Sequence, residues 1–432
     1  MIFQTRDAII CSEVRYLWRK KGTELAAECE YHTLDNGLRI IFSHTPSRVV
    51  YSGVYINVGS RDEAGADEGM AHFIEHSLFK GTTHRKAYHI LNRIDGVGGE
   101  LNAFTTKEET CVYATSLAEH LPRCLELFAD ILFHSTFPEA EIEKEREVVI
   151  EEINSYSDLP AELIFDQFEE LAFEGHSLAH NILGTKRNVR RFTPERLRGH
   201  MERNYTPSRM VISVVGDVKF SRLVRMCERY FGDFGNHASA VDRGAKPVFR
   251  NFERTMHKRT HQAHILIGCE APDIYNADKT AFTLINNILG GPAMNSRLNV
   301  SVRERYGFCY SVESQYVPFS DTGLFYIYAG VDLDAQERAI GLIRRELERM
   351  ALVRLTQQQL RQAQRQFIGQ MAINNDNGSN EMQSIGKACL NFEHVDTLEE
   401  MNADIMNLTP DEVLRVAQSR FAPDGISVLI YN

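Results

Sequence analysis

The 432-residue sequence predicts an α+β fold built from two similar units in tandem. Its elements occur twice in the same order: a strand, a helix, two further strands and two further helices. Apolar and polar residues alternate in VYSGVYINV and in TGLFYIYAGV, which is typical of strands in a sheet with one covered side. The chain is also long enough for two domains that each bury a core. Each unit is therefore expected to be a sandwich of two layers, an antiparallel-rich sheet with helices on one face.

The first unit is predicted to begin with the strand VVYSGVYINVG and to continue with a helix around His72. Two strands around Asn102 and Val112 are expected to pair as a hairpin, and two helices follow them. The last of these helices spans residues 138–156, with Pro138 in its first turn. Thr136 or Ser135 is expected to cap it, because a hydroxyl at that point accepts hydrogen bonds from the free amides of a helix start.

The second unit repeats this order with the strand AHILIGCEA, the helix TAFTLINNIL and the strands CYSVESQYV and GLFYIYAGV, and ends in two helices over 335–351 and 356–372. Between the units, the segment NHASAVDRGAK is polar and without periodicity, so it is predicted to be a linker. The predicted domains are an N-terminal extension over 1–30, a first domain over 31–235, a linker over 236–246 and a second domain over 247–432.

The run HFIEH, residues 72–76, carries the residue types of a zinc hydrolase. On a helix, positions i, i+3 and i+4 point the same way, so His72, Glu75 and His76 share one face. Two imidazoles one turn apart can bind Zn²⁺, and the carboxylate between them lies beside a metal-bound water. The pattern H-x-x-E-H is the signature of inverzincins. Surface histidines with an unrelated glutamate are the alternative interpretation.

A catalytic zinc needs a third protein ligand, and the helix over 138–156 offers two glutamates. Glu145 and Glu152 lie along the edge of its apolar stripe, two turns apart on the same side. One of them could bind the metal while the other supports a ligand. Helix geometry alone fits a buried salt bridge to a basic residue equally well. The stripe itself consists of Ile142, Val149, Ile153 and Tyr156.

With these motifs, the chain resembles the pitrilysin/insulysin family of zinc metallopeptidases, which includes short bacterial processing-type peptidases and mitochondrial processing peptidase. The resemblance implies that Glu152 is the third zinc ligand, within an E-x-x-x-x-x-x-E helix that starts at Glu145. It also implies a substrate-binding strand after the Gly-Gly turn in GGELNAFT, with Asn102, Ala103 and Thr105 along the bound peptide.

A further family motif, R-x-x-x-G-x-x-Y, is matched by Arg303, Gly307 and Tyr310. The resemblance implies that Tyr310 donates a hydrogen bond to the developing oxyanion and that Arg303 helps to hold the peptide or its carbonyl. In the family, four units form a clamshell around a chamber. This chain has two, so it is expected to be half of a clamshell, completed in a homodimer or, alternatively, a heterodimer.

The expected activity is that of a zinc endopeptidase acting on peptides or unfolded polypeptides, with one Zn²⁺ per chain. Bound by His72, His76 and Glu152, the ion would activate a water, and Glu75 would take its proton and pass it to the departing amine. The alternative is a non-catalytic or partner-dependent subunit of a hetero-oligomeric processing peptidase. The presence of all four residues favours the enzyme.

The second unit is expected to have kept the fold without the metal ligands. When the two halves are aligned, Glu145 corresponds to Ala363 and Glu152 to Gln370. The helix of the zinc motif corresponds to one that carries Phe282, Ile285 and Asn286.

Composition fits an enzyme of the cytoplasm. A net charge of −11 argues against nucleic acid and anionic membrane surfaces as partners. No apolar run approaches the length of a membrane span. Residues 1–30 lack the apolar core of a signal peptide. A mitochondrial presequence is also disfavoured by its acidic residues Asp7, Glu13, Glu24 and Glu28.

Overall fold

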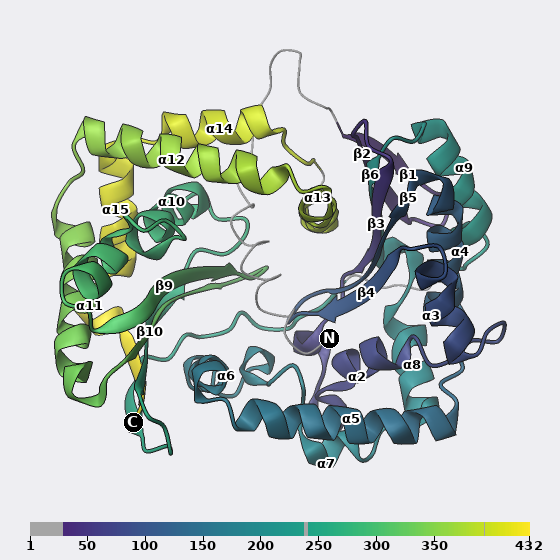
Figure 1. The fold of residues 1–432 in the computed structure, drawn as a ribbon, viewed down its shortest axis with the longest axis horizontal. Helices are drawn as coiled ribbons and strands as arrows, with labels where there is room; N and C mark the ends of the chain where they lie inside the picture. The colour runs from purple at the N-terminus through teal and green to yellow at the C-terminus, as the bar shows by residue number, and fades with distance from the viewer. Residues whose placement is uncertain (1–28, 237–240, 393) are drawn as a thin grey trace.

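A computed structural model describes residues 29–236, 241–392 and 394–432, so most of the predicted extension and part of the predicted linker lie outside it. The described residues form two sheets that stand apart, each with its own helical layer (Figure 1). The predicted α+β fold of two similar units is confirmed. The first sheet has the order β1-β2-β6-β3-β5-β4 and the second β7-β11-β8-β10-β9.

Most neighbouring strands are antiparallel, and only β2 with β6 and β7 with β11 run parallel among the strands of the described residues. The first sheet comprises β1 (Glu30–Thr33), β2 (Arg39–His44), β3 (Val49–Ile56), β4 (Glu100–Thr105), β5 (Thr110–Leu117) and β6 (Met210–Gly216). The second comprises β7 (Glu253–Met256), β8 (Ala263–Ala271), β9 (Cys309–Pro318), β10 (Gly323–Val331) and β11 (Ser427–Tyr431).

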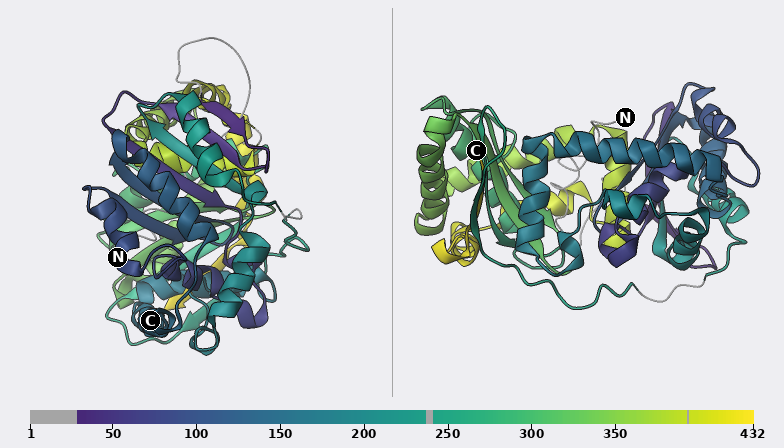
Figure 2. Two further views of the ribbon diagram at one scale, coloured as in Figure 1. Left: turned by 90° about the vertical axis from the view of Figure 1, so that its right-hand side faces the viewer. Right: turned by 90° about the horizontal axis from the view of Figure 1, so that it is seen from below.

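The outer face of each sheet is covered by helices of its own unit, and the two main hydrophobic cores lie there (Figures 1 and 2). On the first sheet these helices are α3 (Ala87–Asp95), α4 (Leu121–Phe133) and α9 (Phe220–Phe231). On the second they are α10 (Lys279–Gly290), α11 (Gln336–Leu352) and α15 (Pro410–Arg420), with α12 (Gln357–Asn375) and α14 (Leu398–Asn407) beside them.

One helix of each unit packs on the sheet of the other unit. Helix α6 (Pro160–Ala172) packs on β8 and β11 of the second sheet, whereas α13 (Gly378–Asn391) packs on β3 and β6 of the first (Figure 1). The approach of α13 is close, because a Cβ on Gly386 would come within 2.6 Å of the Tyr55 ring. In addition to their own main cores, the two halves of the chain therefore share two apolar clusters where they meet.

The start of helix α5 (Glu139–Ser157) differs from the expectation. Neither Ser135 nor Thr136 caps it; Pro138 occupies the N-cap position and makes no side-chain capping bond. The Ser135 hydroxyl donates instead to the carbonyl of Ile131, at the end of α4. Phe137 takes a positive φ of 51° as its ring enters the core, so the chain turns too sharply for the preceding hydroxyls to reach the new helix.

Across the described ranges, no helix combines the length and the apolar character that crossing a membrane requires.

Candidate metal centre

Helix α2 (Met70–Ser77) carries the H-x-x-E-H residues, as predicted. It starts after Gly69, whose φ of 90° favours glycine. A Cβ at this position would also lie only 2.7 Å from the carbonyl oxygen of Leu183. The buried carboxylate of Glu63 accepts hydrogen bonds from the amides of Gly69 (2.7 Å) and Ala71 (2.5 Å). Those amides have no partner within the helix, so Glu63 caps its first turn. Sequence analysis missed Glu63, because it lies in an irregular segment before the helix.

Three side chains from two helices converge beside α2. The Oε2 atom of Glu152, on α5, lies 3.8 Å from His72 Nε2 and 3.4 Å from His76 Nε2. One ligand atom from each residue lies within 4.8 Å of the other two, so the group could hold a metal ion. Two imidazole nitrogens and one carboxylate oxygen make up the ligand set of many catalytic zinc sites, in which the fourth position stays open.

The second nitrogen of His76 is bound in a way that suits a metal ligand. Its Nδ1 lies 2.9 Å from Glu145 Oε1, and Lys80 Nζ lies 2.5 Å from the other oxygen of Glu145. With Nδ1 donating to the carboxylate of Glu145, Nε2 faces Glu152 and can bind a cation once it gives up its own proton. Helix geometry alone left the two glutamates equivalent; in the fold, Glu152 faces both Nε2 atoms and Glu145 supports His76.

His72 lacks such support. Within the part of the chain that the structure describes, its buried Nδ1 has no hydrogen-bond partner. Burial, together with the neighbouring His76, lowers the pKa of His72 to about 3. His72 is therefore neutral at ordinary pH, the state in which an imidazole binds a metal.

The charge balance of the group also fits a cation. Burial opposes a proton on His76, yet its hydrogen bonds to Glu145 and Glu152 raise its pKa to about 10. Burial likewise favours a neutral Glu152, yet the hydrogen bond from His76 keeps the pKa of that carboxyl below its usual value. A divalent ion bound here would replace the proton of His76 and lie against the negative charge of Glu152.

Glu75 lies on the same face of α2, near the end of β4. Burial raises the pKa of its carboxyl to about 6, while His76 and the Thr105 hydroxyl lower it in part. A carboxyl that titrates near neutral pH can both accept and return a proton.

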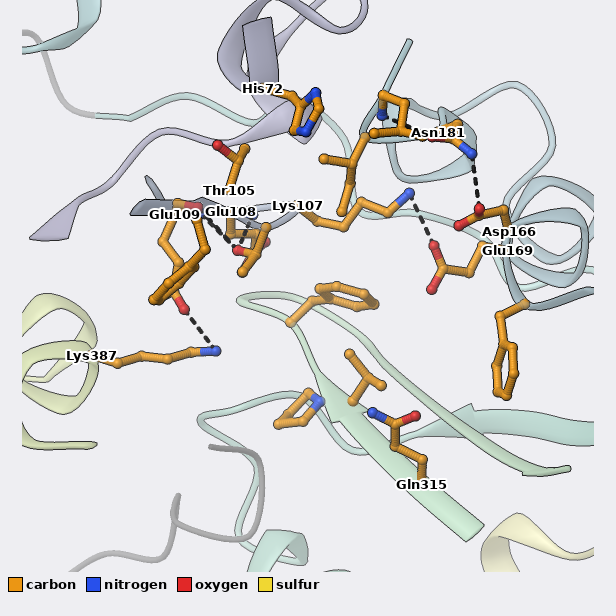
Figure 3. A pocket seen from close by; sticks show the side chains of 18 of the residues that line it. His72, Thr105, Lys107, Glu108, Glu109, Asp166, Glu169, Asn181, Gln315 and Lys387 are labelled. Carbon is orange, nitrogen blue, oxygen red and sulfur yellow. Dashed lines mark hydrogen bonds and ion pairs between the residues drawn. The ribbon is translucent and has the colours of Figure 1, made fainter. Parts of the chain in front are cut away.

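Strand β4 is the last strand of its sheet and passes beside α2. On one side Asn102 pairs with Tyr113 and Ala103 with Val112, both on β5. Its other side pairs with no strand of the described residues, so it is an edge to which a further strand can add. Phe104 and Thr105, at its end, line a cavity of about 170 Å³ between the two units, together with His72, Glu152 and residues of the second sheet (Figure 3).

Arg303 and Tyr310 lie elsewhere in the chain. They line a second hollow of about 570 Å³ in the second unit, and Asn286 and Gln370 line the same hollow. The Tyr310 side chain is 87% exposed, with the Arg303 guanidinium 5.7 Å from the centre of its ring. The structure thus brings His72, Glu75, His76 and Glu152 together and leaves Arg303 and Tyr310 apart from them, in the second unit. The hollow beside Arg303 and Tyr310 is lined by the amide side chains of Asn286 and Gln370.

Comparison with known proteins agrees with this architecture. Residues 39–186 match the family described as Insulinase (Peptidase family M16), and residues 191–367 match the one described as Peptidase M16 inactive domain. The chain is 35% identical over 400 residues to the Bacillus subtilis protein named zinc protease YmxG, covering 92% of this chain and 97% of that protein. The chain belongs to peptidase family M16.

Other M16 relatives and structures agree. A Streptomyces coelicolor protein named a zinc protease is 35% identical over 429 residues, covering 96% of this chain and 93% of that protein. A solved protease from Helicobacter pylori superposes with a TM-score of 0.87 at 22% identity, covering 94% of this chain and all of that one. At that identity the likeness shows the fold alone. All four residues of the α2–α5 site fall within the first M16 match, and relatives named zinc proteases support zinc as the metal.

Proposed function

We propose that this M16 member is a zinc-dependent endopeptidase that hydrolyses peptides or partly unfolded polypeptides. The observation that carries the proposal is the convergence of His72, His76 and Glu152 beside Glu75, next to the open edge of β4. A purely structural metal site would need neither a general base such as Glu75 nor a strand edge at which a peptide could bind.

The roles follow from the geometry. His72, His76 and Glu152 would hold one Zn²⁺ per chain, and Glu145 would orient His76. When bound, the ion polarises the scissile carbonyl and makes a water more acidic. Glu75 takes the proton of the attacking water and returns it to the departing amine. The substrate adds to β4 as an extended strand along Asn102, Ala103 and Thr105, which fixes its register through main-chain hydrogen bonds.

Digestion of a peptide library, with the products identified by mass spectrometry, tests this function. The purified protein should cleave internal bonds of many peptides, and a zinc chelator should abolish cleavage while the circular dichroism spectrum stays largely unchanged, because three side chains and not the core depend on the ion. Cleavage that persists after proven zinc removal would contradict the proposal.

We further propose that two chains form a chamber in which Arg303 and Tyr310 of one subunit serve the zinc centre of the other. Two observations support this arrangement. The chain has two units, and Tyr310 is exposed on the rim of a hollow separate from the cavity beside His72. There the Tyr310 hydroxyl would donate a hydrogen bond to the developing oxyanion.

Mixing two impaired variants distinguishes this arrangement from completion within one chain. Glu75→Gln and Tyr310→Phe proteins, combined under conditions in which subunits exchange, should regain activity above that of either parent. Mixed dimers would hold one site with both lesions and one site with neither. If no activity returns although exchange is demonstrated by mass spectrometry, the site is completed within one chain or does not use Tyr310. If the purified wild-type chain is inactive until a different protein is added, the alternative of a partner-dependent subunit holds.

A further inference from the structure

The turn over residues 106–109, between β4 and β5, is bound to the rest of the molecule by three consecutive charged side chains. Lys107, Glu108 and Glu109 each contact a different element, and each of those elements lies in or against the second unit (Figure 3). We propose that this turn is a positioning element that fixes the substrate strand β4 against the second sheet. The proposal rests on the function proposed above and concerns how tightly substrate binds.

Glu108 is bound to the loop between β9 and β10. Its Oε1 accepts hydrogen bonds from Arg61 (2.5 Å) and from the Ser320 hydroxyl (2.7 Å), and its Oε2 accepts one from the Ser320 amide (2.9 Å). The same Arg61 donates to both oxygens of Asp321, at 2.8 and 2.5 Å. The Arg61 side chain is fully buried, so this ion network lies inside the contact region between the two units.

Lys107 and Glu109 bind α6 and α13, the two helices that pack on the sheet of the other unit. The Lys107 ammonium lies 2.9 Å from Glu169 on α6 and donates to the carbonyl of Leu178 at 3.1 Å. Glu109 lies 2.9 Å from the ammonium of Lys387 on α13. Both turn residues are over nine-tenths buried. Removing one partner from a buried pair leaves an uncompensated charge, so these contacts resist displacement.

The backbone of the turn is fixed as well. The amides of Ser60 and Arg61 donate to the carbonyls of Thr106 (3.1 Å) and Lys107 (2.7 Å). A Cβ on Gly59 would meet Thr106 O at 2.4 Å, so the two segments can approach this closely only because residue 59 is glycine.

The turn matters for β4 because it follows the end of the strand that adjoins Glu75. One edge of β4 pairs with β5, and the other, which faces no strand within residues 29–236, 241–392 and 394–432, is where substrate would add. Its last residue, Thr105, adjoins Glu75 and directly precedes the turn. A turn that moves with the contact region would therefore shift the strand to which substrate adds. A loosened β4 must be ordered again by each incoming peptide, which weakens substrate binding and leaves bound substrate to react normally.

Glu108→Gln tests the proposal, because it keeps the size of the side chain and removes the charge that Arg61 binds. In the zinc-loaded, full-length protein, KM for peptides should rise about tenfold while kcat stays within about twofold. The β4 amides that bond to β5 should exchange hydrogen about ten times faster. The control is Glu174→Gln, the same change in the exposed pair with Arg250, for which neither value should move.

Lys387→Met is the second variant, should Glu108→Gln fail to fold, because it breaks the contact of Glu109 with α13 and removes no atom of the turn. Unchanged KM and unchanged exchange of β4 in a folded variant would overturn the proposal. Hydrogen exchange needs no catalysis. If the zinc-loaded wild-type protein cleaves no peptide but β4 still exchanges faster in Glu108→Gln, the peptidase function is contradicted and the mechanical role of the turn is upheld.

Discussion

Glu75→Gln is expected to keep its zinc and to lose at least about a hundredfold in peptidase turnover. Glutamine preserves the size and the hydrogen-bonding capacity of the side chain but cannot accept the proton of the attacking water. Glu75 is also outside the group of ligand atoms formed by His72, His76 and Glu152, so the metal should stay. The measurements are kcat on a peptide substrate and zinc content by elemental analysis of the same preparation.

Glu147→Gln is the matched control, because Glu147 lies on the exposed side of α5 and its substitution should leave both values unchanged. A Glu75→Gln protein without zinc would make Glu75 a ligand and overturn the proposed roles. One that keeps both zinc and full turnover would exclude Glu75 as the base.

His76→Ala is expected to abolish both the bound zinc, about one ion per chain in the wild type, and the activity. The substitution removes one of three protein bonds to the metal and also releases Glu145, which holds His76 at 2.9 Å. Elemental analysis measures the loss, and circular dichroism checks that the fold survives. Glu145→Gln should be milder, lowering zinc affinity by a factor of about 10 to 100, because it disturbs only the orientation of His76.

The control for this series is His89→Ala, an exposed histidine on the nearby helix α3 that should leave the zinc content unaltered. Undiminished zinc in purified His76→Ala protein would refute the assignment of the site.

Much of the α2–α5 site could be predicted because it depends on local geometry. Helical periodicity alone puts His72, Glu75 and His76 on one face, and the apolar stripe of the next long helix orients Glu145 and Glu152 toward the interior. Local geometry could not decide which of the two glutamates is the metal ligand. Seven residues apart on one helix, both carboxylates pointed the same way, and the choice came from the family resemblance; in the fold, only Glu152 faces both Nε2 atoms.

The cap of α5 was predicted wrongly for a related reason. A hydroxyl shortly before a helix is a good capping signal, but it assumes that the chain enters the helix directly. Here Phe137 must reach the core of the first unit, and this tertiary requirement sets a positive φ that turns Ser135 back toward α4. Burial of one aromatic ring outweighed a local hydrogen bond.

The sequence by itself determined the two sheets, the helix of the zinc motif and the residue types at the candidate metal centre, since strand alternation and helical spacing are properties of neighbouring residues. Only the tertiary structure decided that α6 and α13 cross between the units and that residues 107–109 join β4 to the second sheet. An amphipathic helix carries the same pattern whichever sheet it covers, and a buried ion pair leaves no trace of its partner in the local sequence. Those choices depend on the shapes of surfaces that exist only after distant segments have folded together.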